Sequence, residues 1–405
     1  MPFPHRLFGR RCPSRASFAA KSIALVLVLV LVAAACSDDD DDGGDDAADQ
    51  SDGGGDAPAP EAPIIFNGQG NDLAAYESEA PFESQFVYES FEDDPENGRD
   101  VNAQICFFPD GSGRFVAGED TNQPDPPAGW GIFQLSGDAV GDLSAEQVGK
   151  LTPTYQEGDD PENYGCGFLS DGRILTTDIG NQFPGDPGTG QLIVWFPPFD
   201  SFEVAYCKVD IEIATAGQIM VDEEDNVYVA SNRPPTSGII RYSGDFPTSP
   251  DAEGGCGRTD PTGEPLIDEG AVTTETVVPG GDHGLLSPSA IVASGNGTYY
   301  VSSVSTGSIN EYDENFEFVR TILAPPEGTP LGPEPFPHGT PFGLGVDSEG
   351  TLYYADLGVV RNGTEIGPGD GTGTVRRITF VDGEPQEPEI MDEGLAFPDG
   401  IGILE

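Results

Sequence analysis

The sequence predicts an all-β fold, namely a six-bladed β-propeller with four-stranded blades, closed by pairing of its N- and C-terminal strands. Three observations predict it. The 55 Gly and 37 Pro make nearly a quarter of the 405 residues turn-forming, against about an eighth in average usage. A unit of two apolar strands around a tight turn recurs along the chain, and the last residues match only the start of that unit.

Composition excludes several classes of protein. So many turn formers are incompatible with a helical bundle and favour short strands. The 23 Phe and 12 Tyr are sufficient to fill a core. The 71 acidic residues outnumber the 17 Lys and Arg, giving a formal charge of −54. No nucleic-acid partner is expected, because binding of a phosphate backbone requires a cluster of Lys and Arg side chains that this chain lacks.

The first segment has the organisation of an export signal. Residues 1–22 contain basic residues and no acid, and an apolar run from Ile23 to Ala35 follows. This run is short for a membrane span and typical of a secretory signal. Residues 32–36, Val-Ala-Ala-Ala-Cys, resemble a bacterial lipobox, which predicts cleavage after residue 35 and lipidation of Cys36. The alternative is ordinary Ala-x-Ala cleavage beside an incidental cysteine. Arg10-Arg11 leaves twin-Arg export open beside the general route.

Residues 36–62 are rich in Asp, Gly, Ala and Pro and contain no large apolar side chain. Such like-charged segments cannot build a core and stay extended. We interpret them as a disordered tether between a lipid anchor and a folded domain. The predicted location is the outer side of the bacterial cytoplasmic membrane, or a periplasmic or outer-membrane face, with the lipid as the only membrane contact.

Four cysteines remain after the predicted signal and Cys36. An even number of cysteines in an exported chain predicts disulfides. Four cysteines allow three pairings, of which we favour Cys106–Cys166 with Cys207–Cys256. No CxxC pair or Cys/His cluster suggests a zinc site.

The rest of the chain repeats. The clearest unit spans 341–356, where two apolar strands surround the turn Asp347-Ser348-Glu349-Gly350. Further copies surround turn residues 111, 172, 226 and 297, so the step between copies is 53 to 71 residues. Each copy is followed by two further apolar segments. Four strands per unit at this spacing predict propeller blades.

The two ends of this region predict the number of blades. Residues 397–404 match the first strand of the unit at Pro341, and the chain then stops. Three apolar segments near the other end, 64–66, 73–76 and 86–88, belong to no unit. Their pairing with the last strand would complete a sixth blade and leave no free sheet edge. We therefore predict one propeller domain over residues 63–405, as a monomer.

Two motifs carry a family resemblance. Residues 341–356 resemble an NHL-type propeller repeat, and Pro398-Asp399-Gly400 resembles the strand start of the gluconolactonase/senescence-marker-protein superfamily. The resemblance implies a divalent metal, often calcium, at the channel mouth and hydrolysis of lactones or esters. It places Asp399 at a metal-ligand position. The equivalent positions in the other blades are occupied by Ala103, Tyr164, Gly217, Ser289 and Phe342.

Propeller geometry predicts which polar residues share the channel face. The first strand of a blade starts at the rim where the second strand ends, so residues at these points lie around one channel mouth. The two histidines that this geometry places at the channel mouth are candidate catalytic residues, since His titrates near neutral pH. The alternative is that their side chains form hydrogen bonds with local carbonyls. The candidate metal ligands are Asp399, Asn102, Asn163 and Asp356. The candidate ligand-face residues are Asp178, Asn181, Asn232 and Ser303, and the candidate catalytic pair is His283 and His338.

The motif Asp-Asp-Pro-Glu-Asn occurs twice, at 93–97 and 159–163, in each case before a first strand. Carboxylate and amide oxygens suit Ca²⁺. The alternative is a solvated acidic turn.

Three functions follow from these features. The first is a surface-anchored propeller that binds a small molecule, glycan or protein at its channel face. The second is a metal-dependent, calcium-type lactonase or esterase. The third is a quinoprotein-like sugar dehydrogenase, which would need a basic cofactor pocket near Arg233, Arg361 and His338. The sequence leaves open whether the protein is an enzyme.

Overall fold

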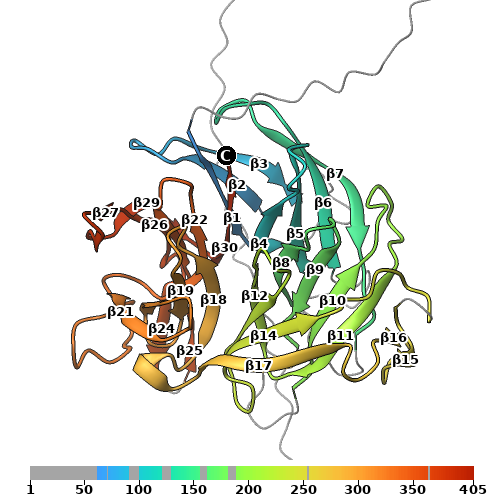
Figure 1. Cartoon of the computed structure of the whole chain (residues 1–405). Coiled ribbons are helices and arrows are strands. Elements are labelled where there is room, and N and C mark those ends of the chain that lie inside the picture. The colour runs from blue at the N-terminus through green and yellow to red at the C-terminus, as the bar shows by residue number, and fades with distance from the viewer. Residues whose placement is uncertain are drawn as a thin grey trace, which may run out of the picture. The chain divides into compact units, whose positions relative to one another are not determined.

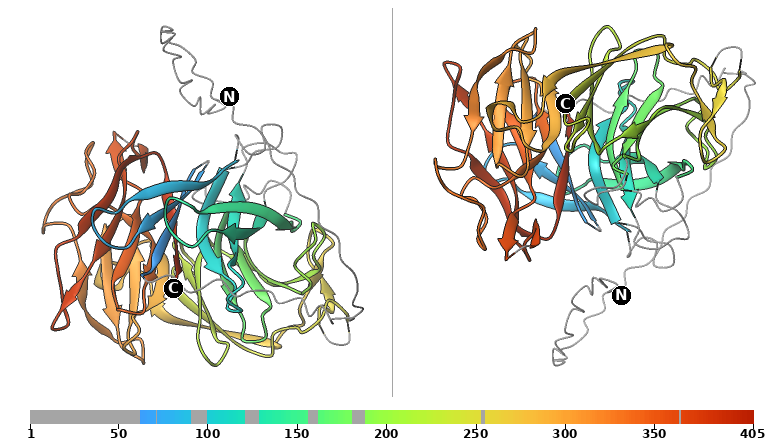
Figure 2. Two further views of the ribbon diagram at one scale, coloured as in Figure 1. Left: turned by 90° about the horizontal axis from the view of Figure 1, so that it is seen from above. Right: turned by 90° about the horizontal axis from the view of Figure 1, so that it is seen from below.

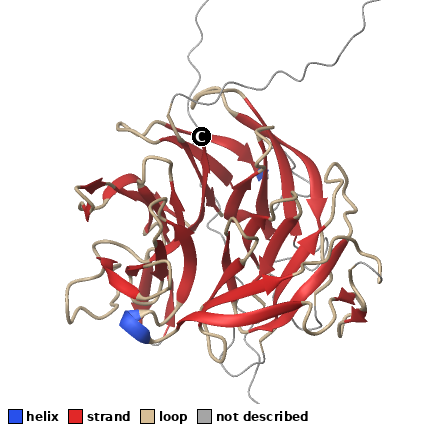
Figure 3. Cartoon of the chain, in the orientation of Figure 1, coloured by secondary structure: helices blue, strands red, loops and turns tan. Residues whose placement is uncertain are grey.

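The computed structural model describes residues 62–405 except 71, 91–99, 121–128, 156–161, 181–187, 253–254 and 364. These residues all belong to the larger of two compact units, 55–405. The predicted signal, Cys36, most of the tether and Asn181 lie outside the described residues. Strands make up most of the described part (Figure 3). It contains no helix with the length and apolar character needed to cross a bilayer.

The predicted six-bladed propeller is confirmed. Six sheets of at least four strands surround a common axis, and the four blade strands of each are antiparallel (Figures 1 and 2). The sixth blade combines both ends of the chain in the order β3-β2-β1-β30, as predicted. Ile64 pairs with Leu404 and Phe66 with Gly402, so the last strand lies beside the first. The strands of this composite blade are β1 (Ile64–Gln69), β2 (Asp72–Glu77), β3 (Ser84–Glu89) and β30 (Pro398–Leu404).

The other five blades follow in chain order. The first comprises β4 (Asp100–Phe107), β5 (Arg114–Asp120), β6 (Gly129–Ser136) and β7 (Ser144–Leu151). The second comprises β8 (Asn163–Phe168), β9 (Ile174–Asp178), β10 (Gly190–Trp195) and β11 (Tyr206–Ile213). The third comprises β12 (Ala216–Val221), β13 (Val227–Ser231), β14 (Gly238–Gly244) and β17 (Val272–Pro279).

The fourth and fifth blades complete the ring. The fourth comprises β18 (Pro288–Ala293), β19 (Tyr299–Ser303), β20 (Ser308–Tyr312) and β21 (Phe318–Leu323). The fifth comprises β22 (Pro341–Val346), β23 (Leu352–Asp356), β26 (Gly373–Ile378) and β29 (Glu389–Leu395). Three short hairpins extend the blades: β15 (Arg258–Thr259) with β16 (Pro265–Leu266), β24 (Val359–Asn362) with β25 (Glu365–Pro368), and β27 (Phe380–Val381) with β28 (Glu384–Pro385).

The inner strands form a closed ring in the order β4, β8, β12, β18, β22 and β30, and each contacts the next. Glycines allow this close approach. A Cβ atom on Gly400 would collide with the carbonyl oxygen of Ala103 on the neighbouring inner strand, and one on Gly165 would collide with that of Gly217. The side chains that do occupy the channel must therefore come from a few other positions.

The core lies between adjacent sheets. For example, Phe66 of the composite blade packs with Phe115 and Phe133 of the first blade in one cluster. The rings of Phe115 and Phe133 stack with centroids 5.1 Å apart. Burial of such aromatic side chains between adjacent blades provides the main stabilisation of the propeller.

Both disulfides have the predicted pairing. Cys106 of β4 is bonded to Cys166 of β8, which joins two neighbouring inner strands. Cys207 of β11 is bonded to Cys256, which lies in the segment that carries the β15–β16 hairpin.

Candidate functional site: the channel mouth

The start of each inner strand lies beside the end of the second strand of its blade. The register pairs Asn163 with Asp178, Pro288 with Ser303, and Pro341 with Asp356. These six residues therefore lie at one rim of the ring, which we call the channel mouth. The hairpin turns between first and second strands lie at the opposite rim, which we call the turn rim.

Two aromatic rings meet at the channel mouth. Tyr164 of β8 and Phe342 of β22 come from opposite blades of the ring, and their ring centroids are 4.4 Å apart. Both side chains are buried. The Tyr164 hydroxyl is also buried and forms no hydrogen bond within the described part of the chain.

Asp399 lies in the same layer of the channel. Its Oδ1 atom accepts a hydrogen bond of 2.9 Å from the backbone N–H of Ala103 on the neighbouring inner strand. The side chain is buried, with 2% of its surface exposed. Burial raises the pKa of the Tyr164 hydroxyl well above its usual range, and the charges of Asp399 and Glu162 raise it further. Tyr164 is therefore a neutral phenol at physiological pH.

Apolar side chains surround this layer. Ile179 follows the second strand of one blade and Leu357 that of another, and both pack with Tyr164 and Phe342. Val359 of the β24–β25 hairpin joins the same cluster. Val304, Leu331 and Phe397 complete it at the partly exposed edge. The centre of the channel mouth is thus an apolar cluster that contains the buried phenol of Tyr164, with the carboxylate of Asp399 nearby.

Two glutamines close the channel by bonding the backbone. Gln104 of β4 accepts hydrogen bonds from the backbone N–H groups of Cys166 and Ile219 and donates one to the Ile219 carbonyl. Gln218 forms the same pair of bonds with the backbone of Leu344. Each of these backbone groups follows a register shift in its inner strand. The inner strands are the edge strands of their sheets, so the glutamines satisfy backbone groups on the side that has no ladder partner.

The candidate ligands Asp356 and Asp178 bond their own blades. The Oδ1 atom of Asp356 accepts bonds from the N–H groups of Thr340 and Gly358, and its Oδ2 atom accepts one from the Thr374 hydroxyl. Asp178 repeats this pattern with the N–H groups of Glu162 and Gly180. Both carboxylates therefore fasten the start of an inner strand to the turn after the second strand.

The candidates Asn163 and Ser303 also bond the backbone. The Asn163 side chain donates to the carbonyls of Glu119 and Gly129 in the preceding blade and accepts from the Tyr155 hydroxyl. The Ser303 hydroxyl accepts from the Ser287 N–H and the Thr306 hydroxyl.

The two remaining polar candidates are Asn102 and Asn232. Asn102 is buried beside Gly118, and its Oδ1 atom has no hydrogen-bond partner within the described part. Asn232 is partly exposed, and its backbone N–H bonds the Thr215 carbonyl.

The two histidines lie in different surroundings. The exposed ring of His283 stacks on Phe318 of the outermost strand β21, with centroids 3.9 Å apart. The backbone carbonyl of His338 accepts a bond from the Tyr354 hydroxyl, beside the loop that Asp356 fastens. Within the described ranges, no three side chains of His, Cys, Asp or Glu converge in an arrangement that would hold a metal ion.

The residues at the channel mouth do not fit the calcium ion that the resemblance implies. A hard cation requires six or more oxygen ligands. Here Asp399 is the one carboxylate among the six equivalent positions, and Phe342 presents a ring at another. No catalytic step through a metal is therefore derived for this chain.

Sequence reasoning treated Tyr164 and Phe342 only as positions that lack a ligand, and it missed the apolar cluster and the two glutamines. One signal was present. The triplets Asp178-Ile179-Gly180 and Asp356-Leu357-Gly358 place an apolar residue between the fastening carboxylate and a glycine with positive φ. An apolar residue repeated at that rim position indicates that the mouth is not lined by polar ligands alone.

No model of a protein family matches the sequence, and no curated protein matches it. Solved structures with a similar fold include the periplasmic gluconolactonase of Pseudomonas aeruginosa, with 10% identity over 85% of this chain and 99% of that one and a TM-score of 0.48. They also include virginiamycin B lyase from Staphylococcus aureus, with 11% identity over 82% and 81% and a TM-score of 0.43. Regucalcin from Agrobacterium tumefaciens shares 13% identity over 73% and 77%, with a TM-score of 0.42. Similarity at this level concerns the fold alone.

Proposed function

We propose that the protein is an exported, lipid-anchored propeller that binds a small molecule with an apolar moiety at its channel mouth, without catalysing a reaction on it. The observation that carries this proposal is the Tyr164–Phe342 pair within an apolar cluster at the centre of the mouth. Mostly apolar walls with few polar groups are typical of small-molecule sites.

The polar groups at the mouth support binding rather than hydrolysis. Asp356, Asp178 and Ser303 are used in hydrogen bonds to their own blades. The hydroxyl of Tyr164, which forms no hydrogen bond within the described part of the chain, is the polar group at the apolar centre. It would orient a ligand that presents an acceptor to the phenol.

The test uses the full mature chain with the neutral dye Nile red as the apolar probe. We expect saturable dye binding, and we expect Leu357→Asp to weaken it, because a charge would then stand in the apolar cluster. Val319→Asp is the matched control, since Val319 is an exposed residue of β21 outside this cluster. Equal dye binding by both variants would contradict the proposal.

A second measurement separates binding from the metal-dependent hydrolase. We expect the thermal midpoint to be unchanged by a chelator, and aryl esters and δ-lactones to show no turnover above buffer. A midpoint that rises with Ca²⁺ but not with Mg²⁺, accompanied by turnover, would favour the hydrolase instead.

The lipid anchor is part of the proposal. Ile64, where β1 begins, pairs with Leu404, where β30 ends, at the turn rim, while Gln69 pairs with Pro398 at the channel mouth. A tether that precedes residue 64 would thus join the domain at the turn rim, the rim opposite to the channel mouth. Metabolic labelling with a radioactive fatty acid should mark the wild-type chain and not Cys36→Ala. Equal labelling of both would exclude this anchor.

A further inference from the structure

A cavity of about 280 Å³ opens between the fourth and fifth blades at the turn rim, on the side opposite to the channel mouth. Its walls include the β18–β19 turn with Asn296, the β22–β23 turn with Ser348 and Glu349, and Arg320 of β21. Tyr300 and Phe380 supply two aromatic rings that lie nearly parallel, with centroids 5.8 Å apart.

The β27–β28 hairpin forms one wall of this cavity and is bonded to the neighbouring blade. Arg320 of the fourth blade donates to the carbonyl of Gly383 in that hairpin of the fifth blade. Its guanidinium also forms ion pairs with Glu311 at 2.7 Å and Glu384 at 3.4 Å. Each nitrogen of the guanidinium therefore has a partner, and the side chain links the two blades beside the cavity.

Several polar groups of the lining have no partner in the described part of the chain. The Tyr300 hydroxyl, the Asn296 side-chain NH₂ and the Glu349 carboxylate form no hydrogen bond or ion pair there, whereas Asp347 is saturated by Thr351, Glu349 and Tyr353. Burial and the charge of Glu311, opposed by Arg320, raise the pKa of Tyr300 to about 12. Its hydroxyl is therefore protonated and can both donate and accept.

We propose that this cavity is a binding site for an amino sugar of monosaccharide size. The acids in and around the cavity, Asp347, Glu349, Glu311 and Glu384, outnumber its single arginine, so an ammonium group is favoured and an anion is disfavoured. Free donors and acceptors beside an aromatic face suit hydroxyl groups and the apolar face of a pyranose. The volume of about 280 Å³ lies just below the range of about 300–1,000 Å³ for ligand pockets, which limits the ligand to the size of a monosaccharide.

In this assignment Glu349 accepts from the ligand ammonium, Asn296 and Tyr300 bond ligand hydroxyls, and Phe380 packs against the ring. The proposal is independent of the channel mouth, because the residues of this cavity lie at the turn rim.

Titration calorimetry of the mature protein with four probes tests it: glucosamine, glucose, choline and gluconate. We expect glucosamine to bind saturably and about tenfold more tightly than glucose, the effect of one charge-assisted hydrogen bond. Choline should bind less tightly than glucosamine because it lacks the ring hydroxyls, and gluconate should not bind. Absence of saturable glucosamine binding, or equal binding of gluconate, would overturn the proposal.

Variants locate the site. Glu349→Gln should remove the preference for glucosamine over glucose, and Tyr300→Phe should weaken both sugars. Glu224→Gln is the matched control, because Glu224 occupies the equivalent turn of the third blade and its N–H bonds Asp222 as that of Glu349 bonds Asp347. Equal affinities of E349Q and E224Q would overturn the assignment. Ser348→Arg, which places a bulky cation on the same exposed turn, is a second variant and should abolish binding.

Discussion

Tyr164 and Phe342 meet in the channel from opposite blades, with ring centroids 4.4 Å apart and ring planes inclined by 56°. The contact leaves the Tyr164 hydroxyl buried without a hydrogen-bond partner within the described residues. A buried, unpaired polar group costs free energy. Evolution tolerates such a cost most readily where a ligand completes the bond, which is the role proposed for the mouth.

Replacement of Tyr164 by Phe should therefore stabilise the ligand-free protein. Removal of the unpaired hydroxyl is expected to raise the free energy of unfolding by about 1 kcal/mol. Chemical denaturation measures this, with Phe342→Ala as the control that should lower it by about 3 kcal/mol through loss of packing. A less stable Y164F protein would show that the hydroxyl already has a partner.

Gln104 should be essential for the closed channel. Gln104→Leu would leave the backbone groups of Cys166 and Ile219 unpaired, at a combined cost of about 3 kcal/mol. Denaturation midpoints compare this variant with Gln386→Leu, whose side chain is exposed and bonds only the Glu384 carbonyl. A similar small effect of both changes would argue against this role.

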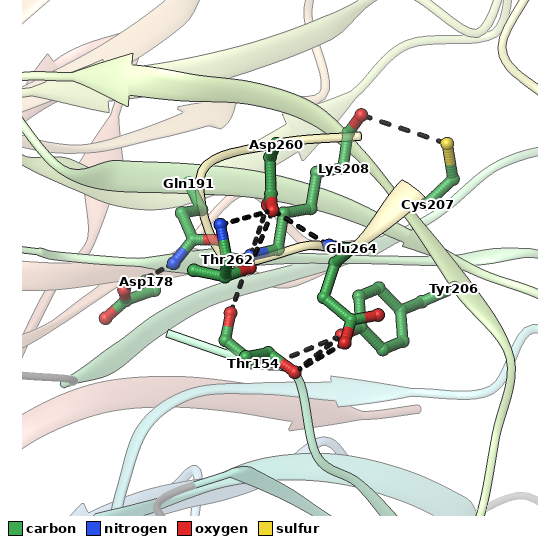
Figure 4. A network of polar contacts seen from close by, with 9 residues as sticks. All are labelled: Thr154, Asp178, Gln191, Tyr206, Cys207, Lys208, Asp260, Thr262 and Glu264. Atoms are coloured by element: carbon green, nitrogen blue, oxygen red, sulfur yellow. Dashed lines mark hydrogen bonds and ion pairs between the residues drawn. The ribbon is translucent and has the colours of Figure 1, made fainter. Parts of the chain in front are cut away.

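The ion pair of Lys208 and Asp260 should determine how substitutions in the second blade change the free energy of unfolding. The Lys208 ammonium forms an ion pair of 2.6 Å with Asp260 and donates to the Thr262 hydroxyl and the Thr154 carbonyl. Figure 4 shows these residues together. Both side chains of the ion pair are fully buried. Lys208→Met should cost about 4 kcal/mol because it leaves an uncompensated buried carboxylate. The double variant K208M/D260L should recover most of this loss; no recovery would show that the pair matters beyond its charges.

The same pair predicts a loss of stability in acid. Burial alone would raise the pKa of Asp260, but bonds from Lys208, Thr262 and the Glu264 N–H lower it overall. A carboxyl whose pKa is lower in the folded state stabilises the protein above its unfolded value of about 4 and loses this contribution as the pH falls further. Thermal midpoints of wild type and Asp260→Asn should therefore converge below about pH 4. A constant difference at all pH values would contradict this.

The disulfide between β4 and β8 should matter for stability. It closes a loop with a sequence separation of 60 residues, for which chain entropy predicts about 4 kcal/mol. The double variant C106A/C166A should unfold at a correspondingly lower denaturant concentration. Reductant should lower the denaturation midpoint of the wild type. In the C106A/C166A variant only Cys207–Cys256 remains to be reduced, so any change of its midpoint comes from that disulfide alone.

Patterns that repeat along the chain predicted the fold well. The turn residues 111, 172, 226, 297 and 350 revealed five hairpins, and the unmatched strand at 397–404 revealed the closure by β1 and β30. The hairpins and the closure depend on local sequence, turn chemistry and periodicity, which a single chain displays directly. The favoured disulfide pairing, one of three that four cysteines allow, is also the one in the structure.

Such patterns do not predict where individual side chains point. Sequence reasoning placed Asp356 at the channel rim, but its bonds to Thr340, Gly358 and Thr374 depend on tertiary contacts and on the turn of Gly358. Gln104 reaches backbone groups of two other blades, with partners 62 and 115 residues away. The buried contact of Lys208 with Asp260 likewise depends on how the β15–β16 hairpin folds back onto β11.

The position of β1 between β30 and β2 has a mechanical consequence. Traction on the chain ahead of Ile64 would act along β1, perpendicular to the hydrogen bonds that it shares with both neighbours. Bonds loaded in shear share the force and must break together, whereas a strand at a free edge peels away one bond at a time. A domain held at this end would resist drag from flowing medium with two ladders at once.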